Sequence, residues 1–93
     1  MTIEWDDTKN TGNIRKHGID FNDVAEMFDH PMLVMLDTRQ DYGEDRSIGI
    51  GFLRDLVAVV VYIEWESEDR IRIISARKAT RHEEKAFREY LAH

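Results

Sequence analysis

The valine-rich run from Leu56 to Trp65 is the feature of this sequence that most limits the fold. β-Branched and aromatic residues favour strands, and a nearly continuous apolar run bounded by polar residues is typical of a strand buried within a sheet. The run therefore predicts the central strand of a sheet, around which the rest of the chain is arranged.

Three further segments have the composition of strands, and polar, turn-compatible residues separate them. In one of them Arg46, Ile48, Ile50 and Phe52 fall at alternate positions, which is the period of a strand with one buried face. Because the connections are short, antiparallel neighbours are favoured. In chain order the predicted strands are 32–37, 45–52, 56–65 and 70–76.

A first helix is predicted ahead of these strands. Asp6 or Asp7 caps its start, and the helix runs to about His17, where Gly18 suits a left-handed C-cap. Gly12 in its middle weakens it somewhat, because glycine loses more backbone entropy than other residues.

Two more helices follow from the same kind of signal. Asp20 caps the second, with Asp23 three residues later, and Pro31 ends it. Thr80 and Glu83 form the pattern of a capping box at the start of the last helix. We therefore expect one small α+β domain over residues 1–93, a four-stranded antiparallel sheet with two helices before it and one after it.

Charge divides the chain into two unequal parts. Residues 70–93 carry seven Lys or Arg and three Glu, whereas residues 1–69 carry six Lys or Arg and sixteen Asp or Glu, for a net charge of −6. The overall acidity argues against a general nucleic-acid-binding protein. The basic C-terminal quarter suits contact with phosphate, and the acidic remainder suits a basic protein partner. The alternative is that both are ordinary solvated surfaces.

Cellular location and cofactors are predicted from what the sequence lacks. It has no cysteine, no basic and apolar leader, and no apolar stretch near the roughly 20 residues that span a bilayer. We therefore expect a soluble cytoplasmic protein that does not enter membranes. Its histidines, His17, His30, His82 and His93, lack the spacing of metal ligands. Neither a metal nor another cofactor is expected.

One group of candidate functional residues lies on the first predicted helix. Helical spacing places Lys9, Asn13, Lys16 and His17 on one stripe. Lysine can neutralise a phosphate, and histidine can exchange a proton near neutral pH, so the stripe suits a phosphodiester. The alternative is a solvated surface on which His17 offsets the helix dipole.

A second group lies on the last predicted strand and its exit. Alternation places Arg72 on the face opposite Ile71, Ile73 and Ser75. Arg77 and Lys78 lie just before the last helix, whose N-terminus suits an anion. The alternative for these cations is that they keep the edge of the sheet soluble.

Glu83 also has two interpretations. It is either the capping partner of Thr80 or a base that removes the proton from a ribose 2′-hydroxyl.

The same segments resemble the signatures of the BrnT family. The first signature is the pattern Trp5-Asp6-x-x-Lys9-x-x-x-Asn13-x-x-Lys16-His17-Gly18-Ile19-x-Phe21. The second is the pattern Ile71-Arg72-Ile73-Ile74-Ser75-Ala76-Arg77-Lys78-Ala79-Thr80-Arg81-x-Glu83. Arg46 followed by Gly49 or Gly51 fits the middle strand of the family.

The resemblance implies a RelE-like fold and a metal-independent ribonuclease, the toxin of a type II toxin–antitoxin pair that inhibits translation by cleaving RNA. It also implies a BrnA-like antitoxin, a ribbon-helix-helix protein whose dimerisation would give a heterotetramer. DNA would then be contacted only through the antitoxin.

One segment departs from the family pattern. The third strand of the family commonly ends in Tyr or His, then Thr-x-Arg, whereas this chain has Tyr62-Ile63-Glu64-Trp65. If the usual arginine contacts RNA, its replacement by Trp65 weakens cleavage or alters its specificity. The alternative function is therefore a catalytically inert antitoxin-binding module that acts in promoter autoregulation.

Cleavage without a metal requires removal of the 2′-hydroxyl proton, stabilisation of the charged phosphorane and protonation of the 5′-oxygen. We expect Arg72 and Arg77 to contact the phosphate, and Lys16 and His17 to approach it from the helical side, with His17 as the better acid or base. Tyr62 or Glu83 would assist proton transfer. The remaining predicted RNA contacts are Lys9, Arg46 and Lys78.

Overall fold

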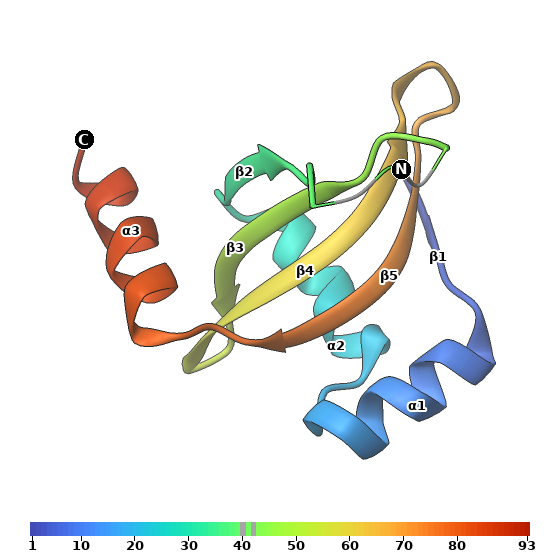
Figure 1. Cartoon of the computed structure of the whole chain (residues 1–93), viewed down its shortest axis with the longest axis horizontal. Coiled ribbons are helices and arrows are strands. Elements are labelled where there is room, and N and C mark those ends of the chain that lie inside the picture. Colours follow the sequence, from blue (N-terminus) through green and yellow to red (C-terminus); the bar gives the residue numbers. More distant parts are fainter. Residues whose placement is uncertain (40, 42) are drawn as a thin grey trace.

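The computed structural model describes residues 1–39, 41 and 43–93. The α-helices are α1 (Asp7–His17), α2 (Phe21–Val24) and α3 (Arg81–Ala92), and the 3₁₀ helices are η1 (Ala25–Asp29) and η2 (Glu66–Glu68). The strands are β1 (Thr2–Glu4), β2 (Leu33–Leu36), β3 (Ser47–Leu53), β4 (Leu56–Trp65) and β5 (Arg70–Lys78). Helices and one sheet together confirm the α+β class (Figure 1).

The described strands form one sheet in the order β1-β5-β4-β3-β2. The prediction of four antiparallel strands is wrong, because β1 adds a fifth strand that runs parallel to β5, with Ile3 opposite Ile71. A strand of three residues is too short to show a period in the sequence. The other pairs, β2–β3, β3–β4 and β4–β5, are antiparallel as expected.

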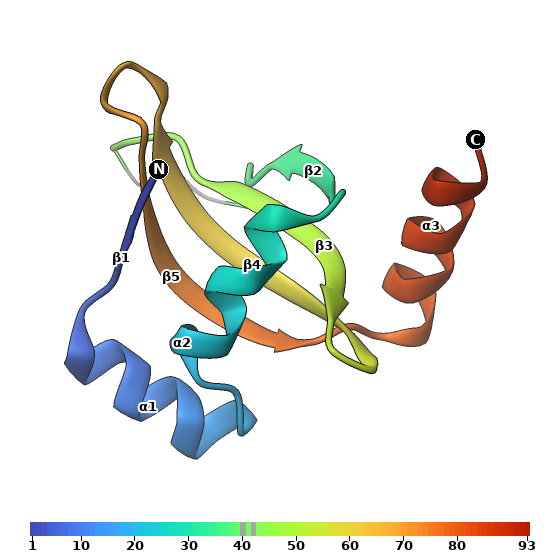
Figure 2. The ribbon, with the colours of Figure 1, turned by 180° about the vertical axis from the view of Figure 1, so that it is seen from behind.

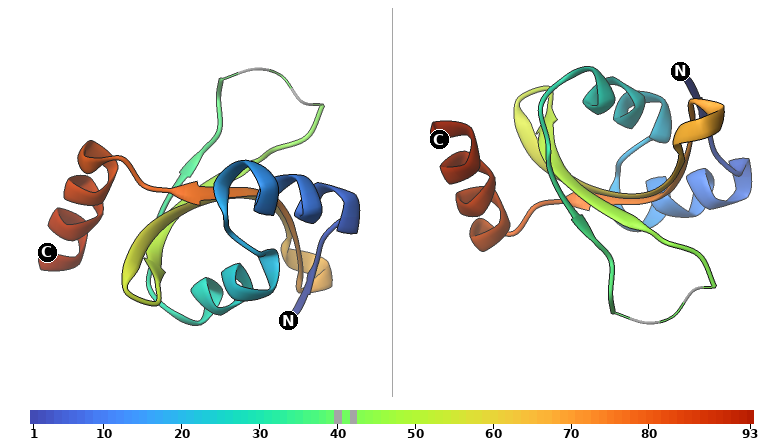
Figure 3. Two further views of the ribbon diagram at one scale, coloured as in Figure 1. Left: turned by 90° about the horizontal axis from the view of Figure 1, so that it is seen from below. Right: turned by 90° about the horizontal axis from the view of Figure 1, so that it is seen from above.

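The central position of β4 is confirmed, since it lies between β3 and β5 and every residue from Val57 to Ile63 is buried. On one face of the sheet, α2 and η1 lie within its concave side (Figures 2 and 3). Their apolar residues Phe21, Val24 and Met27 are almost fully buried. They join a core with Ala58, Val60, Tyr62, Ile71, Ile73 and Ala76 from the sheet.

The opposite face carries a second, smaller core against α3. Phe87 is fully buried there with Ile50, Val57, Val59 and Ala79. Phe52 meets Phe87 edge to face, with 5.1 Å between ring centroids. Figure 3 shows α3 standing at one end of the sheet rather than lying across it. Much of this second face therefore remains uncovered by a helix.

The predicted caps of α1 are confirmed. The Asp6 carboxylate accepts a hydrogen bond from the Lys9 N–H at 3.0 Å, and Gly18 has a φ of 71°. That left-handed conformation is one that glycine adopts without steric cost.

The second predicted helix is not one continuous α-helix. It makes a single α-helical turn, α2, and continues as η1 to Asp29, before Pro31. Asp20 does cap it, but Asp23 forms an ion pair with Arg54 at 2.8 Å instead of closing a capping box. A 3₁₀ helix has three residues per turn, which brings Val24 and Met27 onto the same buried side.

Among the described residues, no helix has both the length and the apolar character required to cross a membrane.

Two glycines of β3 allow a close approach that a larger residue would prevent. A Cβ built on Gly51 would lie 2.8 Å from the Met32 Cγ, and one on Gly49 would lie 3.0 Å from the Met32 Sδ. Gly12 differs, because a Cβ there would meet nothing within 4 Å.

We predict opposite effects of one substitution at two glycines. Gly51→Ala should lower the free energy of unfolding by about 1–3 kcal/mol, because it overpacks against Met32. Gly12→Ala should raise it by up to about 1 kcal/mol, since alanine favours the helical conformation. Urea denaturation followed by circular dichroism measures both, and equal effects of the two changes would contradict the packing around Met32.

Candidate functional site

A β-bulge in β5 determines which side chains reach the uncovered face of the sheet. Val61 pairs with Ser75 and Tyr62 pairs with Ile73, so Ile74 is an extra residue in β5. The prediction that Ser75 shares a face with Ile71 and Ile73 is wrong for this reason. Beyond the bulge, Ala76 returns to the core under α2, while Ser75 and Arg77 line a pocket on the other face.

Arg77 is held at the end of β5 by Glu83 from the first turn of α3. Its two terminal nitrogens donate to the two Glu83 carboxylate oxygens, each at 2.8 Å. The same carboxylate accepts from the Thr80 N–H, and the Thr80 hydroxyl accepts from the Glu83 N–H. The predicted capping box is therefore confirmed, and Glu83 also joins α3 to the sheet.

The pKa of Glu83 is lowered from 4.5 to about 2, chiefly by the hydrogen bonds from Arg77. The pKa of Arg77 is raised, chiefly by those same bonds, while the charge of nearby Arg39 acts in the opposite direction. Glu83 is therefore a carboxylate at neutral pH with little tendency to accept a proton. Its geometry suits the orientation of Arg77 more than it suits general-base chemistry.

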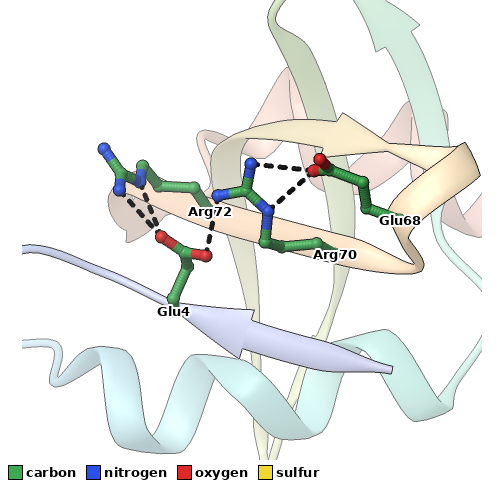
Figure 4. A network of polar contacts seen from close by, with 4 residues as sticks. All are labelled: Glu4, Glu68, Arg70 and Arg72. Carbon is green, nitrogen blue, oxygen red and sulfur yellow. Dashed lines mark hydrogen bonds and ion pairs between the residues drawn. The ribbon is translucent and has the colours of Figure 1, made fainter.

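Arg72 lies on the same face of β5 but belongs to a different network (Figure 4). Its guanidinium donates to Glu4 of β1 at 2.8 Å, and Arg70 donates to the other oxygen of Glu4 and to Glu68. These hydrogen bonds lower the pKa of Glu4, and the bond from Arg70 has the larger effect. The network fixes β1 beside β5, and the Arg72 side chain remains 47% exposed.

Trp65 and Ile63, the residues that differ from the pattern expected of the family, lie beside this network. Trp65 pairs with Arg70 across the strands, and the Arg70 guanidinium carbon lies 3.9 Å from the centroid of the Trp65 ring. Ile63 pairs with Arg72 and is buried. A cation thus stacks on the ring of Trp65, which stands where the resemblance to the family predicts an arginine.

The predicted stripe on α1 does not form as one solvent-facing surface. Lys9, Lys16 and His17 are exposed, whereas Asn13 is buried. The Asn13 side chain accepts from the Ala76 N–H at 3.1 Å and donates to the Ile19 carbonyl at 2.9 Å. Asn13 therefore satisfies backbone groups at the edge of β5 and is structural.

Two other predicted residues lie apart from Arg77. Tyr62 is buried in the core under α2 and η1, edge to face with Phe28 at 5.0 Å, so it lies on the opposite face of the sheet. Burial raises its pKa, with the charge of Glu64 acting in the same direction and a hydrogen bond with Ser47 acting against it. Arg46 lies half-buried just before β3, and its carbonyl accepts from the Asp37 N–H at 2.8 Å.

The described contacts bring predicted site residues together at the end of β5, where Arg77 pairs with Glu83 and also donates to the Lys78 carbonyl at 3.3 Å. Lys78 is exposed at the end of β5 and lines a different pocket, along α3. The described lining of the pocket beside Arg77 does not include Lys9, Lys16 or His17. In the part of the chain that the structure describes, no three His, Asp or Glu side chains are grouped as metal ligands.

Two residues of the pocket were missed by the sequence analysis. Arg39 and His82 line it together with Arg77. The available signal for His82 was its place within the capping-box segment, next to Glu83. For Arg39 the available signal was its position two residues after Asp37. In the structure Arg39 donates to the buried Asp37 carboxylate through two hydrogen bonds of 2.8 Å.

Comparisons with known proteins identify relatives of the chain. Residues 5–83 match the model of a family described as the ribonuclease toxin BrnT of type II toxin–antitoxin systems. The chain is similar to the 1.1 Å crystal structure of the Brucella abortus ribonuclease toxin BrnT, with 32% identity and a TM-score of 0.69. That similarity covers 87% of this chain and 99% of the Brucella chain. No curated protein matches significantly.

We predict that Glu83→Gln lowers the free energy of unfolding at pH 7 by about 1 kcal/mol, the scale of a partly exposed ion pair. Because the folded pKa of Glu83 is depressed to about 2, its contribution is present above its ordinary pKa of 4.5 and is lost as the pH falls towards 2. Urea denaturation at pH 7 and pH 3 should therefore show a smaller difference from wild type at the lower pH.

Glu84→Gln is the matched control, because the described ion pair of Glu84 is with Arg88, one turn along α3. It should cost at most about 0.5 kcal/mol at pH 7. A loss from Glu83→Gln that is the same at both pH values would contradict the role of its charge.

Proposed function

Because the chain belongs to the BrnT family of ribonuclease toxins of type II toxin–antitoxin systems, we propose that it cleaves RNA without a metal ion. In this proposal Arg77 stabilises the charge on the scissile phosphate. The observation that carries it is the bidentate Arg77–Glu83 pair at the α3 N-terminus, on the uncovered face of the sheet.

Three features of this pair support a phosphate contact. Glu83 fixes the guanidinium from one side, which reduces the entropy lost when a ligand binds. Arg77 has more N–H donors than its three bonds to Glu83 and the Lys78 carbonyl use. The positive end of the α3 dipole lies beside it. Preorganised donors of this kind stabilise the transition state of phosphoryl transfer.

We assign supporting roles by position. Glu83 is a positioning residue rather than the base, because its carboxylate is engaged and its pKa is near 2. Arg72 is a second phosphate contact, since it lies on the same face and is half-exposed. Tyr62 is left out, because its ring lies in the core on the other face.

His17 is proposed as the acid or base, with Lys16 beside it. Both are exposed in the last turn of α1. The nearby Asn13–Ala76 hydrogen bond fixes α1 against β5, the strand that carries Arg77. In Figure 1 the C-terminal end of α1 points in the same direction along the sheet as the end of β5. A strand of RNA that bends around this edge would meet both elements.

A type II toxin acts opposite an antitoxin, so a protein partner follows from the family. We propose that the partner is a BrnA-like, basic ribbon-helix-helix protein and that dimerisation of the antitoxin gives a heterotetramer. Residues 1–69 carry six basic and sixteen acidic side chains, a net charge of −10. This acidity supports a basic partner.

The second candidate function is the inert antitoxin-binding module. Trp65 at the position of a family arginine favours it. The guanidinium that Arg70 places over the Trp65 ring at 3.9 Å opposes it, because an arginine side chain still lies at that point of the sheet, although Glu4 and Glu68 pair with it.

We predict that the purified protein cuts single-stranded RNA in the presence of EDTA, leaving a 2′,3′-cyclic phosphate and a 5′-hydroxyl. Arg77→Ala should reduce the rate by about 10²-fold or more, the scale for loss of a transition-state charge stabiliser. His17→Ala should reduce it by about 10²-fold if His17 transfers a proton. Gel assays of a labelled oligonucleotide measure each rate.

Lys85→Ala is the control for charge, because Lys85 is 76% exposed and its only described ion pair is with Glu89 along α3. It should change the rate by less than about twofold, within the effect of a surface substitution. Folded Arg77→Ala that cleaves as fast as wild type would remove Arg77 from the mechanism. A folded wild type that cuts no RNA but binds its partner would favour the inert module, and Trp65→Arg would then test the departure.

We also predict that the chain co-purifies with a basic ribbon-helix-helix protein encoded beside it. Size-exclusion chromatography with light scattering should give the mass of two copies of each protein. A chain that remains alone at micromolar concentration of both proteins would contradict this partnership. Raising the salt concentration should slow association, because complementary charge acts mainly on encounter.

A further inference from the structure

The uncovered face of the sheet contains a pocket beside Arg77 with an apolar floor. Its volume is about 380 Å³, within the roughly 300–1,000 Å³ range of small-molecule sites. The floor is formed by side chains of β2, β3 and β4, and Ala86 of α3 forms one wall. The floor residues are Met35, Ile48, Ile50, Val59 and Val61.

The rim of the same pocket is polar and carries cations from separate parts of the chain. Arg39 follows β2, Ser75 and Arg77 belong to β5, and His82 lies in the first turn of α3. Each guanidinium is oriented by its own carboxylate, Arg39 by Asp37 and Arg77 by Glu83. Two oriented guanidiniums at the mouth of an apolar cavity match a ligand with an anionic group and an apolar body.

We propose that this pocket binds one nucleotide of the RNA, with the base in the apolar cavity and the adjoining phosphate between Arg39 and Arg77. The inference rests on the proposed function and makes it more specific. It adds Arg39 and His82 as binding residues and makes Ala86 and the floor valines determinants of base preference.

A nucleotide fits these features better than a protein side chain does. An apolar side chain of a partner would use the floor but would leave the oriented guanidiniums without a new acceptor. An acidic side chain would use the rim but would leave the apolar floor without a partner. A nucleotide satisfies both parts, because its base faces are apolar and its phosphate accepts bidentate hydrogen bonds.

The test measures binding of nucleoside 3′-monophosphates and of inorganic phosphate to the full chain by isothermal titration calorimetry. At least one of the four nucleotides should bind more than tenfold tighter than inorganic phosphate, since the base adds contacts that phosphate lacks. Nucleotides that bind no tighter than inorganic phosphate would overturn the proposal.

Ala86→Leu narrows the cavity with a residue that favours a helix, and Ala92→Leu at the exposed end of α3 is its matched control. Ala86→Leu should lower the affinity for the preferred nucleotide at least tenfold, whereas Ala92→Leu should change that affinity by less than twofold. Unchanged affinity in a folded Ala86→Leu would overturn the proposal. Loss of partner binding in Ala86→Leu with unchanged nucleotide affinity would show that a protein side chain occupies the pocket.

A second measurement uses the wild-type protein, so its result does not depend on whether a variant folds. The methyl signals of Ile48, Val59 and Val61 should shift on titration with the preferred nucleotide, while those of Val24 in the opposite core should not. The reverse pattern would overturn the proposal. Failure of the proposed function can be distinguished from failure of this inference. A wild-type protein that binds a nucleotide in the pocket but cuts no RNA would contradict the proposed cleavage and leave the nucleotide site standing.

Discussion

One extra residue in β5 decides where the cations of the C-terminal segment lie. Simple alternation from Ile71 and Ile73 would direct Arg77 into the core beneath α2. Because the bulge at Ile74 reverses the phase, Ala76 packs in that core and Arg77 reaches the uncovered face with Arg72. Three features depend on this reversal: the pocket, the Arg77–Glu83 ion pair that joins α3 to the sheet, and the proposed phosphate contact.

Glu83 serves structure and the candidate site at once. It closes the capping box of α3 and binds Arg77, so the helix and the cation are positioned by the same carboxylate. Beyond this pair, α3 is held to the sheet largely by Phe87 and its apolar neighbours. A domain of this size has little stability to spare. The orientation of Arg77 and the stability of the α3 start are therefore linked.

Polar residues at helical spacing do not all have the same role. Asn13, which the sequence places with Lys16 and His17, satisfies backbone groups at the edge of β5. Asn10 does the same for α2, since its side chain accepts from the Phe21 N–H at 2.9 Å and donates to Asp20. These amides hold α1 against the sheet and α2. Because a buried amide and an exposed one look alike in sequence, the candidate stripe on α1 was only partly right.

The sequence by itself determined the elements whose signals are local: the α1 caps, the capping box of α3 and the buried central strand β4. It also contained the family patterns around Lys16, His17, Arg77 and Glu83. Only the tertiary structure decided the parallel β1, the bulge at Ile74, and the separation of Tyr62 from Arg77 on opposite faces. Pairing register and strand phase depend on contacts between segments distant in the chain, and periodicity within one segment does not specify them. Arg39 and His82 meet at the pocket for the same reason, since β2, β5 and α3 come together only when the sheet is complete.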